Sequence, residues 1–219
     1  MLPIRDANPA GRFPIVTIGL IVVNVLFFLY ELAFALDAVV YQMGLIPYQV
    51  THSLSGPVVA DLFTSMFLHG GWLHLLGNML YLWIFGDNVE DIMGPVRFLI
   101  FYLAAGVAAA LAQVAIGPNS EIPLVGASGA ISGVLGAYLV RFPHSRVLTL
   151  ITLGYWIRLR EVRAIWVLGF WFVYQFLLGV LSLGAQAGGG VAYFAHIGGF
   201  VAGVALVWVF APGRPGARY

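Results

Sequence analysis

The sequence predicts an all-α polytopic membrane protein with six transmembrane helices, and three observations lead to this prediction. Hydrophobic residues make up 61% of the 219 positions, charged residues only 9%, and the mean hydropathy is +0.96, whereas soluble domains carry about 25% charged residues. Six separate segments are apolar enough to cross a bilayer, and the arginines are confined to the connections on one side of it. At about 20 residues per span, we expect a single membrane domain over residues 1–219.

The predicted spans follow one another with short connections, except after the first. They cover roughly 14–36, 72–87, 95–116, 124–142, 162–183 and 190–211. Pro14, Pro95 and Pro123 lie where spans begin, and the first helical turn is where proline is tolerated. The long connection 37–71 mixes apolar and charged side chains. We expect it to lie partly in the membrane interface without spanning.

The arginines orient the spans. If the N-terminus is cytoplasmic, the connections after spans two and four and the C-terminal segment are cytoplasmic too. All ten arginines then lie inside, because the outer connections 37–71, 117–123 and 184–189 contain no basic residue. We therefore expect a multi-pass protein with both termini cytoplasmic, and its compact six-span form suits a bacterial or archaeal plasma membrane. A cleaved signal peptide ending at Ala33-Phe34-Ala35 is the alternative for the first span, but its apolar core is long for a signal.

The composition also limits the kinds of catalytic and binding sites that the chain can form. The chain has no cysteine, so no disulfide, thiolate nucleophile or cysteine-bound metal is available, and its net charge of +1 gives no indication of a nucleic-acid partner. His69 and His74 are five residues apart, which on a helix separates them by about 140°, and no zinc-protease motif is present. We expect neither a metal nor a cofactor, and composition does not fix the oligomeric state.

A serine and a histidine fall at similar depth in two of the predicted spans. Span four enters from the outer side at about Leu124, which places Ser128 roughly 6 Å along the helix axis. Span six enters from the same side, and His196 lies about 9 Å in. Alone, each has an ordinary explanation, a helix-packing hydroxyl for Ser128 and a hydrogen-bonded core histidine for His196. Together they predict a nucleophile and its general base.

Glycines on the same two spans favour a close approach. Gly129 and Gly133 are four residues apart on span four, and Gly199 and Gly203 repeat this spacing on span six, on the side that carries His196. Small residues at this spacing are common in membrane helices for packing alone. Combined with the matching depth of Ser128 and His196, they predict that the two side chains meet.

Span two adds a second polar pair, His74 and Asn78, which share one helix face. Acyl transfer builds negative charge on a carbonyl oxygen, and an imidazole N–H, an amide NH2 and the Ser128 backbone N–H could stabilise it as an oxyanion hole. His69 is interpreted as a brace for the loop before span two, with its ring donating to backbone carbonyls. His74, Asn78 and His69 therefore have distinct predicted roles.

As a set, these residues resemble the motifs of rhomboid intramembrane serine proteases. The resemblance rests on His69-xxxx-His74-xxx-Asn78, on Gly126-Ala127-Ser128-Gly129-Ala130 and on Ala195-His196-xx-Gly199, in this order. It implies a six-helix rhomboid-like bundle in which Ser128 is the nucleophile, His196 the general base, and His74 with Asn78 the oxyanion stabilisers. Gly126 matches the first glycine of the family's GxSG motif, and Glu90 resembles a structural carboxylate of the family.

The chain departs from the family pattern at two places. The first loop lacks the Trp-Arg pair that many rhomboids carry, which leaves the anchoring of that loop open. Where many have an aromatic residue that stacks on the catalytic histidine, four positions after the nucleophile, this chain has Ser132. Another group must then orient His196, and the sequence does not identify it.

The predicted function is cleavage of transmembrane protein segments near the outer face by a Ser–His dyad. Asp61 and Glu121 are outer-side candidates for a third member of a triad, but both are interpreted as solvated interfacial charges. Water would enter under a loop containing Gly188-Gly189-Gly190, although a plain turn is as good an explanation. A catalytically silent rhomboid-like protein that binds membrane helices is the first alternative. A small-molecule transporter ranks behind it, because no internal repeat is seen.

Overall fold

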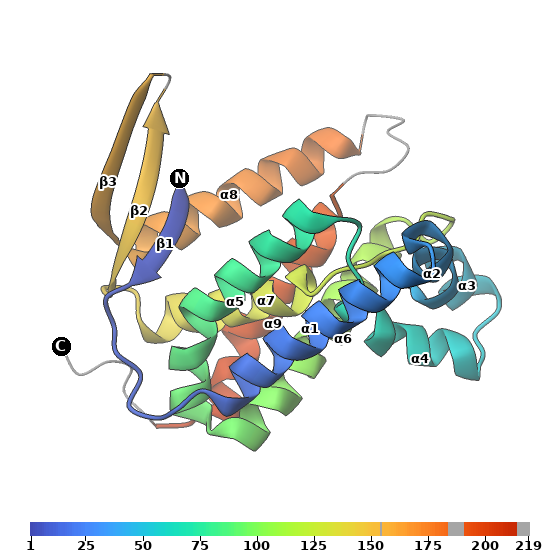
Figure 1. The fold of residues 1–219 in the computed structure, drawn as a ribbon, viewed down its shortest axis with the longest axis horizontal. Helices are drawn as coiled ribbons and strands as arrows, with labels where there is room; N and C mark the ends of the chain where they lie inside the picture. Colours follow the sequence, from blue (N-terminus) through green and yellow to red (C-terminus); the bar gives the residue numbers. More distant parts are fainter. Residues whose placement is uncertain (154, 184–190, 214–219) are drawn as a thin grey trace.

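The computed structural model describes residues 1–153, 155–183 and 191–213 (Figure 1). Helices form a bundle with a small β-sheet at one end and three short helices at the other (Figure 1). The elements in chain order are β1 (Leu2–Asp6), α1 (Ile15–Ala33), α2 (Leu36–Met43), α3 (Pro47–His52), α4 (Gly56–Thr64), the 3-10 turn η1 (Ser65–Phe67), α5 (Trp72–Met93), α6 (Pro95–Ile116), α7 (Ser128–Arg141), β2 (Arg146–Leu153), β3 (Trp156–Arg163), α8 (Ala164–Ser182) and α9 (Tyr193–Phe210).

Four helices in the described ranges, α1, α6, α8 and α9, are long and apolar enough to cross a membrane. The protein is therefore a multi-pass membrane protein. Helix α6 coincides with the predicted third span, 95–116. The start of the predicted sixth span, residue 190, lies outside the described residues, and α9 begins at Tyr193.

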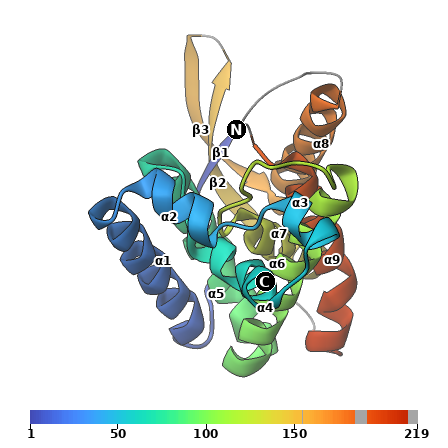
Figure 2. The same ribbon diagram turned by 90° about the vertical axis from the view of Figure 1, so that its right-hand side faces the viewer.

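Helix α7 runs through the middle of the bundle, between α1 on one flank and α8 and α9 on the other (Figure 2). Every residue from Gly129 to Tyr138 is buried. The predicted start at residue 124 is wrong by four residues, because Leu124 exchanges backbone hydrogen bonds with Leu45 and the Gly126 N–H donates to the Ser65 carbonyl. These bonds hold residues 124–126 outside the helix, which has Ala127 as its N-cap and begins at Ser128 inside the protein.

Helix α5 continues six residues beyond the predicted end at residue 87. Its last turns are polar, but their polar groups bind other parts of the chain. The Glu90 carboxylate accepts hydrogen bonds from the Val16 and Thr17 backbone N–H groups and from the Thr17 hydroxyl, at 2.8–2.9 Å. Glu90 therefore satisfies the free N–H groups at the start of α1, a structural role like that implied by the family resemblance.

The sheet corrects the all-α prediction. Strand β2 pairs antiparallel with both β1 and β3, in the order β1-β2-β3. Residues 146–163, expected to be mostly a cytoplasmic connection, instead form a hairpin of two eight-residue strands that satisfy one another's backbone groups. The short strand β1 from the N-terminus adds an edge, with Leu2 opposite Leu150.

Backbone pairing joins segments that are distant in sequence at each end of the bundle. The N-terminal strand β1 lies in one sheet with β2, which follows α7. At the opposite end, Leu45 pairs with Leu124 and the Tyr48 N–H donates to the Ser120 carbonyl. The loops predicted to be outer thus bind each other, as do segments predicted to be inner.

The connection 37–71 forms helices of six to nine residues, none of spanning length, as expected. Protein contacts hold it in place. The Met66 side chain reaches helix α6, where a Cβ added at Gly106 would lie 2.6 Å from the Met66 Cε. The Thr64 hydroxyl donates to the Met43 carbonyl at 2.8 Å, and the Thr51 hydroxyl donates to the Pro118 carbonyl at 2.8 Å. This loop is anchored without a Trp-Arg pair.

Candidate active site

Ser128 and His196 meet in the bundle, as the sequence predicts. The Ser128 Oγ lies 2.8 Å from the His196 Nε2, a hydrogen-bond distance between residues 68 positions apart. Ser128 is the first residue of α7, and His196 lies in the first turn of α9. A serine hydroxyl that donates to an imidazole nitrogen is the arrangement in which the base can take the proton as the oxygen attacks.

Paired glycines bring the two helices together, again as predicted. A Cβ on Gly199 would overlap the Gly129 carbonyl oxygen, and a Cβ on Gly203 would overlap the Gly133 carbonyl oxygen. Backbone therefore lies directly on backbone at two successive turns of α7 and α9. Because these contacts begin one residue after Ser128 and three residues after His196, they set the separation of the two functional side chains.

The orientation of His196 comes from helix α8. The His196 Nδ1 lies 2.8 Å from the Gln175 Oε1, and the Trp171 ring centroid lies 5.9 Å from that of the imidazole. An amide oxygen only accepts, so Nδ1 carries the hydrogen and Nε2 presents a lone pair to Ser128. Ser132, which replaces the family's aromatic residue, donates instead to the Ser128 carbonyl at 2.6 Å.

Sequence reasoning missed Gln175. The signal was present, because a lone amide in the apolar span 162–183 is expensive to bury unless it has a partner or a function. The same helix carries large aromatic side chains, Trp166 and Phe170 among them. Trp166 is 67% exposed and Phe170 54% exposed, as expected for side chains that face lipid.

His74 lies directly against Gly126, in the loop that leads into Ser128. A Cβ on Gly126 would lie 2.7 Å from the His74 Nε2 and 3.6 Å from the Ser128 Oγ, so the imidazole and the hydroxyl border one small space. Gly126 also has φ +121°, which side-chain-bearing residues rarely adopt. The Gly70 N–H donates to the His74 Nδ1 at 3.3 Å, which leaves the hydrogen on Nε2, the nitrogen that faces Gly126.

Asn78 follows His74 by one turn on the same face of α5. It is buried, and its amide nitrogen has no hydrogen-bond partner among the described residues. A buried donor without an acceptor is destabilising by about 1–3 kcal/mol. Together with the His74 Nε2–H, it supplies unoccupied donors on the face of α5 that meets the start of α7.

His69 braces the loop before α5, but not through its ring as predicted. Its backbone N–H donates to both oxygens of the Glu31 carboxylate on α1, at 3.1 Å each. The ring lies beside the Phe67 backbone without a well-formed hydrogen bond. It instead packs edge-on against His74, with centroids 5.1 Å apart. His69 thus limits the movement of the His74 ring.

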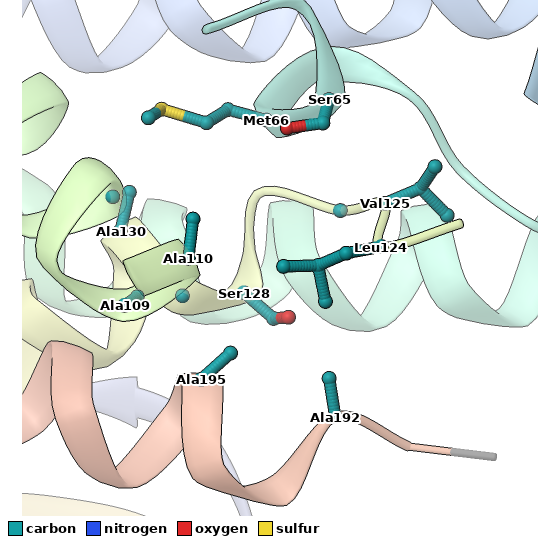
Figure 3. A pocket seen from close by; sticks show the side chains of 13 residues that line it. Ser65, Met66, Ala109, Ala110, Leu124, Val125, Ser128, Ala130, Ala192 and Ala195 are labelled. Carbon is teal, nitrogen blue, oxygen red and sulfur yellow. The ribbon is translucent and has the colours of Figure 1, made fainter. Parts of the chain in front are cut away.

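A small pocket opens beside Ser128 (Figure 3). The Ser128 hydroxyl points into the space between Leu124 and the first turn of α9 (Figure 3). Alanine and glycine residues of α6, α7, α9 and the segments before α7 and α9 make most of the walls, and Ser65 and Met66 close one side. Because most of these residues have a small side chain or none, the pocket has room for a small group next to the Ser128 hydroxyl.

No carboxylate among the described residues hydrogen-bonds to His196. Asp61 and Glu121, the outer-side carboxylates, lie on the loop helix α4 and in the exposed segment before α7. No group of histidine and carboxylate side chains in the described ranges is arranged to hold a metal ion. The predicted Gly188-Gly189-Gly190 loop lies outside the described residues.

Comparison with known proteins connects this geometry to one family. The sequence model of the Rhomboid domain matches residues 57–213. Rhomboid protease GluP of Bacillus subtilis is 44% identical over 93 residues, which cover 42% of this chain and 18% of that protein. RHOMBOID-like protein 1 of Arabidopsis thaliana is 35% identical over 149 residues, 68% of this chain and 34% of that protein. The mitochondrial rhomboid protein 1 of Saccharomyces cerevisiae is 30% identical over 154 residues, 66% of this chain and 40% of that protein. The chain thus spans less than half the length of each of these relatives.

Proposed function

The chain belongs to the rhomboid family, and from this premise we propose that it is an intramembrane serine endopeptidase with a Ser128–His196 dyad. The observation that carries the proposal is the 2.8 Å contact between the Ser128 Oγ and the His196 Nε2. A curated relative named as a rhomboid protease supports the same reaction class.

In the proposed mechanism, His196 removes the Ser128 proton as the oxygen attacks a peptide carbonyl carbon. The new C–O bond converts the carbonyl oxygen to an oxyanion, and the donors of His74, Asn78 and the Ser128 backbone stabilise it. His196 then gives its proton to the leaving amine, and the C–N bond breaks to leave an acyl-enzyme. A water molecule hydrolyses that ester by the same steps, with His196 again as the base.

The pocket beside Ser128 indicates the class of substrate. Its alanine and glycine walls favour a small side chain next to the cleaved bond. A transmembrane helix has its carbonyls bonded within the helix, so it must unwind before Ser128 reaches one. We therefore expect single-span proteins with small and helix-weakening residues near the outer face of the membrane to be substrates.

We propose that α5 and α7 complete a six-span bundle with α1, α6, α8 and α9, forming one rhomboid domain over 1–219. Both are enclosed by other helices to a large extent, so neither needs the length and apolarity of a lipid-facing span. The arginine distribution supports cytoplasmic termini and an active site open to the outer side. We further propose that this membrane is a bacterial or archaeal plasma membrane. Of the relatives reported above, one is a Bacillus subtilis protein and one is mitochondrial.

A tagged fluorophosphonate and a panel of single-span reporter proteins test this function. We expect the purified protein to label at Ser128 and to cleave reporters with unwound, alanine-rich segments. Ser128→Ala removes only a hydroxyl and should abolish both activities at unchanged melting temperature. The Ser128→Ala, His196→Ala double variant should be no worse than either single variant, because nucleophile and base act as one unit. A wild-type protein that binds reporters but neither labels nor cleaves would identify a silent helix-binding protein instead.

A further inference from the structure

Gln175 is a buried amide on helix α8, whose side chains at neighbouring positions are exposed. It is 9% exposed, whereas its neighbours Tyr174 and Phe176 on α8 are 50% and 47% exposed. An amide removed from water without a partner is destabilising by a few kcal/mol. Its partner is the His196 Nδ1 at 2.8 Å. The Gln175 amide oxygen therefore accepts a hydrogen bond from the histidine of the proposed dyad.

Three residues at helical spacing direct α8 against α9 at this point. Trp171, Gln175 and Gly179 are each four residues apart and share one face of α8. The Trp171 ring lies beside His196, and a Cβ on Gly179 would lie 3.2 Å from the Tyr193 Cβ and 3.3 Å from the Ile197 Cδ1. Glycine at this position lets the two helices approach until the amide reaches the imidazole.

We propose that Gln175 is a positioning residue that fixes the tautomer and ring orientation of His196 for proton transfer from Ser128. The inference rests on the proposed function, since it assigns a role within that dyad. With the amide oxygen on Nδ1–H, the lone pair of Nε2 points at the Ser128 hydroxyl. Gln175 thus does with a neutral acceptor what an aspartate does in a Ser-His-Asp triad. Gln175 thus orients His196, the role that an aromatic residue at the position of Ser132 has in many rhomboids.

The surroundings of His196 allow this role to be tested by pH. Ser128 of α7 contacts the imidazole from one side, and Gln175 and Trp171 of α8 contact it from another. In the described part of the chain, His74 of α5 is the titratable group that interacts with it electrostatically. On α6, Gln113 accepts a hydrogen bond from the neighbouring Ala195 N–H at 3.2 Å. Gln113 therefore provides a matched control, a glutamine that binds the same turn of α9 but not the imidazole.

The experiment compares Gln175→Met, Gln175→Glu and Gln113→Met in the full-length protein. We measure fluorophosphonate labelling of Ser128 between pH 5 and 9, and kcat and KM on a cleaved reporter. Methionine keeps the length but removes the acceptor, so Gln175→Met should slow labelling and kcat by about ten- to a hundredfold with little change in KM. Glutamate keeps an acceptor and favours imidazolium, so Gln175→Glu should retain activity at high pH while its acid limb moves about one pH unit upward. Gln113→Met should leave the profile in place.

A measurement on the wild-type protein keeps the test independent of how the variants fold. Nitrogen chemical shifts of labelled histidine should identify His196 as the tautomer with hydrogen on Nδ1. Hydrogen on Nε2 instead would overturn the inference, as would a Gln175→Met protein with the wild-type rate and pH profile. Wild-type protein that fails to label or cleave would count against the proposed function alone, because the tautomer is read without any turnover.

Discussion

Replacing Gly203 by alanine tests whether the contact between α7 and α9 sets the geometry of the dyad. Gly203 lies seven residues beyond His196, two helical turns from the proposed chemistry. A Cβ at this position would lie 2.6 Å from the Gly133 carbonyl carbon, and the carbonyl oxygen is closer still. Both atoms belong to the backbone of α7, so no side chain can rotate to make room.

The size of the effect follows from these distances. Ordinary contact with a Cβ begins at 3.4 Å, so the helices must separate by at least about 0.8 Å there. Transmitted in full to the site, this separation would lengthen the 2.8 Å contact between Ser128 and His196 to about 3.6 Å, which is no longer a hydrogen bond. A misplacement of about 1 Å lowers turnover by roughly a hundredfold. Overpacking should also destabilise the fold by about 1–3 kcal/mol.

Reporter cleavage and melting temperature are measured on the same preparation, with Gly169→Ala as the control. Gly169 lies in helix α8, and an added Cβ there would meet nothing within 4 Å. The control should therefore be as active and at least as stable as the wild type, because alanine is the better helix former. If Gly203→Ala remained folded with wild-type kcat, the glycine contacts would not determine the distance between Ser128 and His196.

Two further predictions concern the proposed oxyanion donors and the end of the bundle that carries the β-sheet. Asn78→Ala should lower kcat by about ten- to a thousandfold with little change in KM. A large loss of melting temperature with normal kcat would make Asn78 a scaffold residue. Burial raises the pKa of Asp6 from 3.8 to about 6, against the opposing hydrogen bond from Tyr138. The folded state thus binds the Asp6 proton more tightly, and the stability it confers is complete below pH 3.8 and lost as the pH rises through 6. The rise corresponds to roughly 3 kcal/mol, which solvent screening of a half-buried carboxyl reduces to about 1–2 kcal/mol. The melting temperature of the wild type should therefore fall relative to Asp6→Asn between pH 4 and 7, and a constant difference would contradict this assignment.

The spans and the dyad could be predicted because both depend on short-range rules. A long apolar segment specifies a membrane helix wherever its neighbours lie, and α6 has the predicted bounds. The glycine faces that bring α7 and α9 together follow from the spacing of four residues on a helix. The start of α7 could not be predicted from apolarity, because residues 124–127 are apolar and yet bonded as a loop to Leu45 and Ser65.

Strands β2 and β3 have a sequence pattern that predicts them, whereas strand β1 has none. Strands β2 and β3 are adjacent runs of eight residues rich in β-branched and apolar side chains, with alternation of arginine and aliphatic residues in β3. This pattern is typical of a hairpin. Strand β1 has no such signal, because the partner of Leu2 is Leu150, and only the folded bundle brings the two together.

The orientation of the polar side chains in the site depends on the packing of several helices, and not on the local sequence alone. Each nitrogen of His196 is satisfied from a different helix, Nε2 by Ser128 of α7 and Nδ1 by Gln175 of α8. The imidazole therefore has its functional orientation only where α7, α8 and α9 are packed together. A motif search finds Ser128 and His196 because their neighbours in sequence are small residues that permit close packing. It does not find Gln175, whose sequence neighbours face lipid and whose role depends entirely on the helix beside it. Residues of this second kind are best sought as lone polar side chains in apolar spans, because the bilayer makes such a residue unfavourable without a partner.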